Sequence, residues 1–190
     1  MLYLSAALIA YLVGSFPTAY VMGRYFHGVD ITKGGTGNIG AMNAYEVTRS
    51  KWIGIAVGTV DILKGLIVTF SFLYISGLIA SSVAALFVVT GHNYSVYMRF
   101  KGGRGLAPSA GALLVLSPLA VLAYLVIYAA LRGVGLKLYL SSVVGIFASA
   151  LAVLWNFSSA HEVELVLAGL FVVVLSKHIG PLKNELIHAS

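Results

Sequence analysis

Long runs without a charged side chain constrain this sequence more than any other feature. No Asp, Glu, Lys or Arg occurs in residues 1–23, 65–98, 105–131 or 138–160. A transmembrane helix needs about 20 mostly apolar residues, and all four runs reach that length. A soluble chain of 190 residues could not bury so much apolar surface against itself. We therefore expect an all-α, polytopic membrane protein.

Charged side chains are scarce, and most of them are basic. Only 9% of the residues are charged, against roughly 25% in a soluble domain. Twelve Lys and Arg outnumber six Asp and Glu, which gives a formal net charge of +6. Because these bases lie mostly between apolar runs, we interpret them as topology signals and expect no nucleic-acid partner. The absence of cysteine excludes disulfides and thiolate metal sites.

The apolar runs predict membrane-spanning helices. The first run has no base before it and is followed by Arg24. That order is wrong for a cleaved signal peptide and typical of a first span with its N-terminus outside. The expected spans are 2–23, 52–76, 78–97, 106–131, 138–157 and 163–177.

The run 106–131 contains Ser117-Pro118, and proline weakens a helix interior. If this run were one span, four bases that follow it would fall outside the cell, against the positive-inside rule. Two short helices instead give seven spans, a cytoplasmic C-terminus and no base in an outside loop. Each would reach only ~20 Å and would tilt, thin the bilayer or form a re-entrant hairpin. No repeat or linker divides the chain, so we expect residues 1–190 to form a single domain.

A glycine-rich segment, residues 33–43, is the first candidate ligand-binding loop. Its four glycines allow positive φ and close approach to a ligand, and successive N–H groups can form an anion nest. The alternative is a flexible connector, but interleaved Asn and small apolar residues favour phosphate binding. The polar members of the segment are Lys33, Thr36, Asn38 and Asn43.

A second segment, Phe100-Lys101-Gly102-Gly103-Arg104-Gly105, follows Gly91-His92-Asn93-Tyr94. An arginine can grip phosphate oxygens with two prongs. A plain anchor on anionic lipid headgroups would explain the bases but not the glycines. The pattern is not a Walker loop. Two glycine-plus-base segments on one membrane face suggest a site that holds two phosphate groups.

Three further features carry polar chemistry within or beside the expected spans. Asp61 and Lys64 share a helix face, and we favour a structural ion pair over a functional one. Ser141 and Ser142 begin a span, where serine commonly bonds its own helix, so a ligand role stays open. His178 is a candidate general base or phosphate ligand. The chain has four further histidines, His27, His92, His161 and His188. No two of the five histidines have metal-ligand spacing, so we predict no metal site.

These motifs, in this order, resemble the bacterial acyl-phosphate:glycerol-3-phosphate acyltransferase family. The stretch 35–43 is similar to the family's Gly-Ser-Gly-Asn-x-Gly-Ala-Thr-Asn. The stretch 61–65 resembles its Asp-x-x-Lys-Gly, and 100–105 resembles its Phe-Lys-Gly-Gly-Lys-Gly. The resemblance covers nearly the whole chain, and the family's seven spans agree with the topology expected from charge.

The resemblance implies transfer of a fatty acyl group from acyl phosphate to the 1-hydroxyl of glycerol 3-phosphate, giving lysophosphatidic acid and phosphate. It implies the first step of phospholipid synthesis, without CoA or a cofactor, in the bacterial inner membrane with the active site facing the cytoplasm. No obligate protein partner is implied. The general base would be His178 or a substrate phosphate oxygen. By similarity, the catalytic residues are His178, Arg104 and Asn38, and the substrate- and phosphate-binding residues are Gly35, Thr36, Gly37, Asn43, Lys101, Gly102, Gly103 and Ser141.

Three departures from the family's motifs leave alternatives open. Glu46 stands where the family usually has Arg, with Arg49 nearby, and Pro181 stands where it has Asn. Arg104 stands where the family has Lys, which is a milder change. The chain could therefore be a homologue that uses another acceptor or binds without turnover. A small organic-phosphate transporter is a third possibility. It is disfavoured because transporters tend to have repeats and midplane sites.

Overall fold

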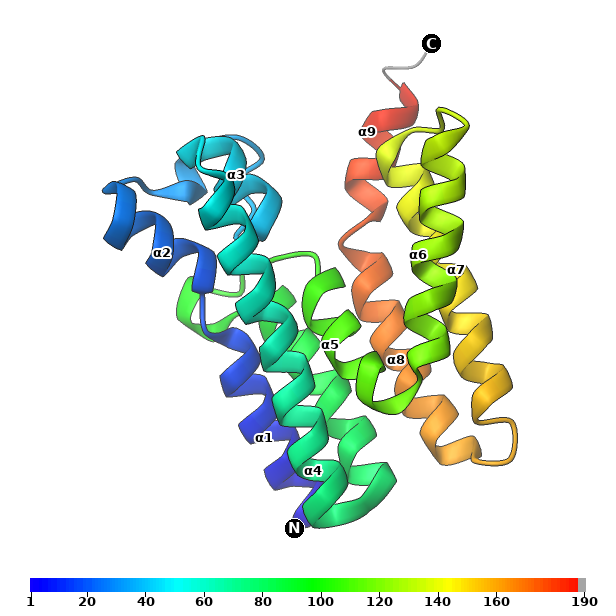
Figure 1. Ribbon diagram of the computed structural model, residues 1–190. Helices are drawn as coiled ribbons and strands as arrows, with labels where there is room; N and C mark the ends of the chain where they lie inside the picture. The colour runs from blue at the N-terminus through cyan, green and yellow to red at the C-terminus, as the bar shows by residue number, and fades with distance from the viewer. Residues whose placement is uncertain (188–190) are drawn as a thin grey trace.

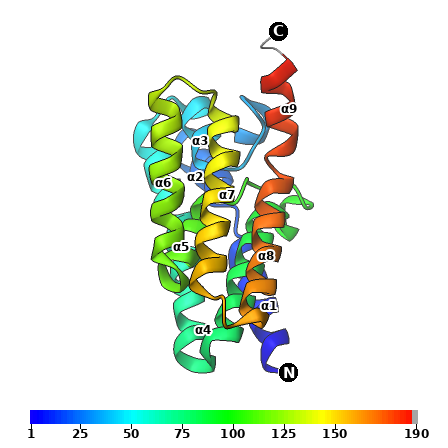
Figure 2. The same cartoon turned by 90° about the vertical axis from the view of Figure 1, so that its right-hand side faces the viewer.

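The computed structural model describes residues 1–187, and His188 lies outside them. In these residues the chain is all helical, and long helices stand side by side (Figure 1). Turned by 90°, α6, α7 and α8 are seen beside one another (Figure 2). The elements are α1 Leu2–Ser15, α2 Thr18–His27, η1 Ile31–Lys33, α3 Ala41–Thr48, α4 Lys51–Asn93, η2 Val96–Met98, α5 Leu106–Leu116, α6 Pro118–Gly133, α7 Leu138–Asn156, α8 His161–Ser176 and α9 Ile179–Ile187.

The expected span 2–23 is not one straight helix. α1 ends at Ser15, and α2 begins at Thr18 and turns aside from the axis of α1 (Figure 1). Pro17 explains the break, because it lacks an N–H and disfavours a helical conformation in the residue before it. Phe16 accordingly has extended backbone, with φ −56° and ψ 120°.

Helix α4 consists of two arms that meet at Gly77, whose φ of 79° and ψ of −174° are not helical. The first arm runs down from α3 and the second returns upward (Figure 1). Across the turn, the Ser81 hydroxyl donates to the Thr69 carbonyl at 2.8 Å. Glycine adopts this conformation without strain, so the chain can turn back at Gly77. The division predicted between 52–76 and 78–97 is confirmed.

Glycines bring pairs of helices into backbone contact. A Cβ on Gly91 would lie 2.1 Å from the Tyr11 carbonyl oxygen, which fixes the second arm of α4 against α1. A Cβ on Gly111 would lie 1.9 Å from the Ile62 carbonyl oxygen, which fixes α5 against the first arm. In lipid, such small residues are what lets helices approach and gain van der Waals contact.

The break predicted at Ser117-Pro118 is confirmed, since α5 ends at Leu116 and α6 begins at Pro118. α5 descends and α6 returns, so both helices have their other ends on the same side of the molecule (Figure 1). By length and hydropathy, three stretches of the described chain can cross a membrane: Leu2–His27, Lys51–Met98 and Leu138–Asn156. The pair α8 and α9, bent by 41°, makes a fourth if it counts as one span. α5 and α6 are shorter apolar helices, so length alone accounts for fewer crossings than the seven expected.

Candidate functional site

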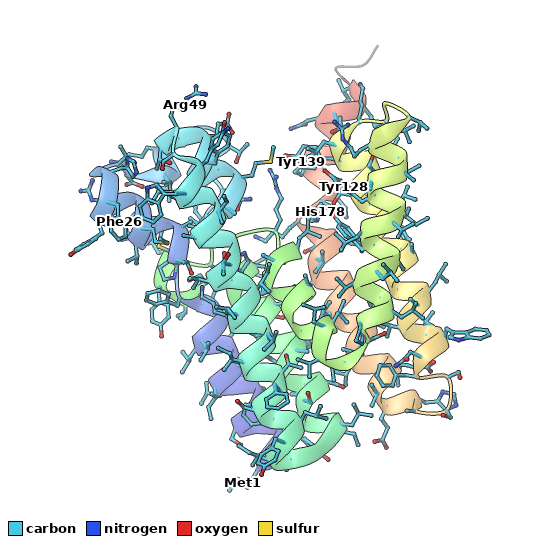
Figure 3. The ribbon with its side chains drawn as sticks, viewed as in Figure 1. Met1, Phe26, Arg49, Tyr128, Tyr139 and His178 are labelled. Carbon is cyan, nitrogen blue, oxygen red and sulfur yellow. The ribbon has the colours of Figure 1, made fainter. Side chains whose placement is uncertain are left out.

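A polar cavity of about 240 Å³ lies where the two glycine-bearing segments meet α6, α7 and the junction of α8 with α9. It brings together all three predicted catalytic residues, Asn38, Arg104 and His178. Tyr128, Tyr139 and His178 lie on the flank of the α6–α9 group that faces α3 and α4 (Figure 3). We call this space the inner cavity. Its further lining residues are Gly40, Ala41, Met42, Asp61, His92, Gly105, Leu106, Ala107, Leu138 and Ser142.

His178 occupies the bend between α8 and α9 and is 1% exposed. Its Nδ1 lies 2.8 Å from the Val174 carbonyl oxygen. A carbonyl can only accept, so Nδ1 carries the proton in this hydrogen bond. Nε2 of the neutral ring then has a free lone pair, which gives the imidazole the orientation that a proton acceptor needs.

The Arg104 guanidinium stacks on Tyr139, with its Cζ 4.8 Å from the centre of the ring. Tyr139 also holds its position through its backbone N–H, which donates to the Glu185 carboxylate at 2.8 Å. Within residues 1–187, Arg104 makes no hydrogen bond or ion pair. A stacked guanidinium keeps its N–H edges free, so Arg104 can donate to a bound anion.

The first glycine-rich segment is organised by Asn43, which is 2% exposed. Its Oδ1 accepts from the Thr36 N–H at 2.8 Å and hydroxyl at 3.2 Å, and its Nδ2 donates to the Ile31 carbonyl at 2.9 Å. A Cβ on Gly35 would lie 2.3 Å from Asn43 Oδ1. These three predicted binding residues thus shape the loop, while Asn38 lines the inner cavity with its Oδ1 buried and unpartnered.

The second segment closes over His92. The Gly103 N–H donates to the His92 carbonyl at 2.9 Å. A Cβ on Gly103 would lie 2.0 Å from His92 Nε2, and one on Gly102 would lie 2.2 Å from the His92 carbonyl oxygen. The glycine pair therefore serves close backbone approach.

The predicted phosphate-binding residues are divided between two cavities. Arg104 lines the inner cavity, whereas Lys101, Gly102 and Gly37 line a separate space of about 770 Å³, which we call the outer cavity. The sequence pattern suggested a common site for two phosphates, and these residues do not converge on one.

The two neighbouring serines differ in role. Ser141 is buried, and its hydroxyl donates to the Lys137 carbonyl at 2.8 Å, the bond within its own helix that was the alternative to ligand binding. Ser142 lines the inner cavity, with its Oγ 3.0 Å from the Tyr124 hydroxyl. Tyr139 also lines the inner cavity, as does Tyr128, which the sequence did not single out. No local signal separates adjacent serines, because a helix turns by about 100° per residue and the partner helices decide which face is lined.

A buried polar network underlies the cavity floor. Asp61 Oδ1 accepts from Lys64 Nζ at 2.9 Å and from the Thr18 hydroxyl at 3.0 Å, and Lys64 also donates to the Phe16 carbonyl at 2.6 Å. The ion pair predicted from the sequence is therefore present. It stabilises the break between α1 and α2, and buried charges of this kind persist only when fully paired. His92 Nδ1 faces the same carboxylate oxygen at 3.7 Å.

An apolar cavity of about 100 Å³ adjoins the inner cavity, and Leu106 lines both. The apolar one is enclosed by α5, α6, α7 and α8, with Tyr124 and Phe171 among its lining residues.

In residues 1–187 no three His, Cys, Asp or Glu side chains are placed to hold a metal ion. A helical membrane protein with Arg, Asn and His in a polar cavity beside an apolar one has the parts to bind a phosphate ester and accept a proton.

The chain belongs to the glycerol-3-phosphate acyltransferase family, whose sequence model matches residues 4–186. It is similar to glycerol-3-phosphate acyltransferase 2 of Moorella thermoacetica, with 45% identity over 120 residues, 63% of this chain and 61% of that protein. The glycerol-3-phosphate acyltransferase of Thermoanaerobacter sp. strain X514 is 34% identical over 87% of this chain and 84% of its own. Glycerol-3-phosphate acyltransferase 5 of Dehalococcoides mccartyi is 30% identical over 99% of this chain and 82% of its own.

The fold is similar to that of a solved integral membrane enzyme. Crystal structures of PlsY (YgiH), an integral membrane glycerol 3-phosphate acyltransferase, in glycerol 3-phosphate and lysophosphatidic acid forms superpose with TM-scores of 0.86 and 0.85. Each is 25% identical to this chain, and the match covers 98% of this chain and 92% of the solved chain. The protein is therefore an integral membrane protein of this family.

Proposed function

We propose that this protein transfers a fatty acyl group from acyl phosphate to the 1-hydroxyl of glycerol 3-phosphate, without CoA. The observation that carries the proposal is the convergence of Arg104, Asn38 and His178 on one polar cavity. The glycerol 3-phosphate and lysophosphatidic acid forms of PlsY supply the acceptor and the product by similarity. The acyl-phosphate donor rests on the motifs at residues 35–43 and 100–105.

The chemistry needs positioning more than a covalent nucleophile. Acyl phosphate is a mixed anhydride, so phosphate leaves readily once a hydroxyl is aligned with the carbonyl carbon. The hydroxyl oxygen forms the new ester bond, and the bond from carbon to the phosphate oxygen breaks. The hydroxyl proton passes to His178 Nε2 or to a phosphate oxygen of the substrate. The Arg104 guanidinium and the Asn38 amide stabilise the negative charge that develops on the carbonyl oxygen and the departing phosphate.

The acyl chain extends from the inner cavity toward the apolar cavity that shares Leu106. Apolar lining is what an alkyl chain requires, since burial of apolar surface away from water is favourable by about 0.8 kcal/mol per methylene. The reacting carbonyl would then lie beside Arg104, at the polar end.

Glu46 and Pro181, two of the departures from the family's motifs, lie outside the wall of the inner cavity. The Glu46 carboxylate lies against Gly35 at the loop surface. This favours the acyltransferase over a homologue that only binds.

We also propose seven crossings in the bacterial cytoplasmic membrane, with the N-terminus outside and the inner cavity on the cytoplasmic side. The distribution of Lys and Arg supports this orientation.

The reaction is tested by mixing the purified protein with palmitoyl phosphate and glycerol 3-phosphate, and following phosphate and lysophosphatidic acid. We expect the two products in equal amounts without CoA. Arg104→Ala should lower turnover at least about 100-fold, because removing a preorganised hydrogen-bond donor from an active site has an effect of this size. Lys183→Ala, at an exposed cation of α9, is the matched control and should keep full activity.

Three other results would change the interpretation. Full activity in Arg104→Ala would remove the inner cavity as the reaction site. Binding of glycerol 3-phosphate without either product would indicate a binding homologue. Phosphate release without lysophosphatidic acid would show that another acceptor, or water, takes the acyl group.

A further inference from the structure

We propose that the floor of the apolar cavity limits the length of the acyl chain that this protein can use, and that Ser149 sets this limit. The limit rests on the proposed function, because the occupant of the cavity is taken to be the acyl group of acyl phosphate. Leu106 lines both the inner cavity and the apolar cavity. A chain whose carbonyl lies in the inner cavity therefore continues into the apolar one.

The apolar cavity runs along α5. Its lining residues on this helix are Leu106, Ser109, Ala110 and Leu113. Their spacing places them on one face of the helix over two turns. Leu113 lies about 10 Å farther along the helix axis than Leu106, at 1.5 Å per residue. An extended alkyl chain with C–C bonds of about 1.5 Å advances by about 1.3 Å per carbon, so roughly eight carbons fit along this face.

Packed side chains close the cavity at the end that faces the turn between α5 and α6 (Figure 1). Just beyond the lining residues, each of the four helices contributes a buried apolar residue of one hydrophobic cluster, and these are Leu116, Ala120, Val153 and Leu167. None of them is more than 7% exposed. Ser117, in the turn itself, is fully buried. The helix break at Ser117-Pro118 therefore lies beneath the cavity and gives it a floor.

Ser149 is the lining residue of α7 that lies nearest to this floor, and it is 3% exposed. Because serine is short, the space at its level stays open to the end of a chain. Helical side chains lean toward the N-terminus of their helix, and α7 begins at Leu138, which lines the inner cavity. Ser149→Leu would therefore extend a side chain up into the cavity and shorten it by about one helical turn, or roughly four carbons of an extended chain.

Leu125 marks the place where a chain could leave the cavity sideways. Among the lining residues, all of which lie in the described part of the chain, Leu125 alone is exposed, at 54%. A chain that turned aside there would reach lipid, which dissolves alkyl carbons as well as the cavity does, and would have no length limit. It would also leave the lower part of the cavity empty and forfeit the van der Waals contacts that filling it gives. The floor is therefore the expected end of the chain.

The test compares chain lengths in one reaction. The purified protein in detergent receives glycerol 3-phosphate and an equimolar mixture of saturated acyl phosphates, from octanoyl to arachidoyl. Mass spectrometry of the lysophosphatidic acids gives the relative use of each chain. We expect product to fall beyond one chain length in the unmodified protein, and to fall about four carbons earlier in Ser149→Leu. Chains between the two limits should lose about tenfold or more relative to octanoyl, because overpacking a closed site has an effect of this size.

Further variants check that the floor is responsible. Ser149→Ala removes the hydroxyl and adds no bulk, so it should keep the unmodified limit. Leu151→Phe adds bulk on the outside of the same helix, where Leu151 is 67% exposed, and should also keep it. Val153→Ala removes two carbons from the floor and should lengthen the usable chain by about two carbons.

Two results would overturn the proposal. An unchanged limit in folded Ser149→Leu would show that the chain does not meet the floor, and a flat profile in the unmodified protein would show that the chain leaves past Leu125. The melting temperature in detergent reports folding, and it should not fall in Ser149→Leu, because this variant fills a cavity. If Ser149→Leu does not fold, an unchanged limit in Val153→Ala rejects the floor.

Failure of the acyltransferase proposal is recognised separately. If the unmodified protein forms no lysophosphatidic acid from any chain, binding of unreactive alkyl phosphates takes the place of turnover. Titration with octyl, dodecyl and hexadecyl phosphate should then show that Ser149→Leu keeps binding of the shortest chain and loses binding of the longest about tenfold or more. Equal affinities of the two proteins for all three chains would reject the floor.

Discussion

His178 is the residue of the inner cavity whose replacement separates the two proton-transfer routes. Its Nδ1 is committed to the Val174 carbonyl, and only Nε2 can receive the hydroxyl proton. We predict that His178→Gln lowers kcat by about 100-fold or more, the usual loss when a general base is removed. Initial rates with palmitoyl phosphate and glycerol 3-phosphate measure it. A kcat within threefold of the unmodified protein would assign the proton to a substrate phosphate oxygen.

Ser142 and Ser141 form a matched pair for testing which face of α7 meets the substrate. The Ser142 hydroxyl lines the inner cavity, whereas the Ser141 hydroxyl bonds to Lys137 within the helix. Losing one hydrogen bond to a ligand costs about 0.5–1.5 kcal/mol. Ser142→Ala should therefore raise the KM for glycerol 3-phosphate about two- to tenfold, and Ser141→Ala should leave it unchanged. The reverse order of the two KM values would contradict the placement of α7.

At the scale of elements, the loop 100–105 depends on how closely its backbone approaches α4. A Cβ on Gly103 would overlap the His92 ring, which is buried and cannot move away freely. We predict that Gly103→Ala lowers the free energy of unfolding by about 1–3 kcal/mol, as overpacking does. Thermal unfolding in detergent measures it. Gly133→Ala is the control, because no atom lies within 4 Å of its added Cβ, and equal stability of the two variants would argue against the close contact.

The breaks in the helices could be predicted from the sequence, because they depend on single residues. Pro118 ends α5 and Gly77 turns α4, and each acts through its own backbone restriction or freedom. Pro17 carries the same local signal as Pro118, and both residues lie inside charge-free runs, but the prediction of one span, 2–23, rested on the run alone. Charge-free runs predict which segments lie in the membrane, but they do not predict where a helix bends.

The arrangement of the two cavities could not be predicted from the sequence. Lys101 and Arg104 are three residues apart, and the sequence shows two bases around two glycines. What places them in different cavities is the contact of Gly102 and Gly103 with His92, a residue of another element. The choice of Ser142 over Ser141 likewise depends on how α7 is turned against its neighbours. Both are decided by packing between distant segments, which local patterns do not record.

The whole molecule has large apolar side chains on its outside and small residues where its helices meet. Leu8 is 58% exposed, Leu151 67% and Trp155 81%, while Ala10, Ala84 and Ala112 are fully buried. A lipid environment accounts for this inversion, because lipid tails solvate leucine as well as a protein core does. The fold is thus stabilised mainly by close helix contact and internal hydrogen bonds.

Orientation in the membrane can be tested cleanly because the chain has no cysteine. We predict that a membrane-impermeant maleimide added to intact spheroplasts labels Ser158→Cys, between α7 and α8. It should not label Lys33→Cys, Val134→Cys or Lys183→Cys until the membrane is opened. Val134 decides between the alternatives: two crossings by α5 and α6 place it inside, whereas one continuous span places it outside. The two helices descend and return in Figure 1, which supports protection of Val134→Cys. Its labelling in intact spheroplasts would reject the seven-crossing topology.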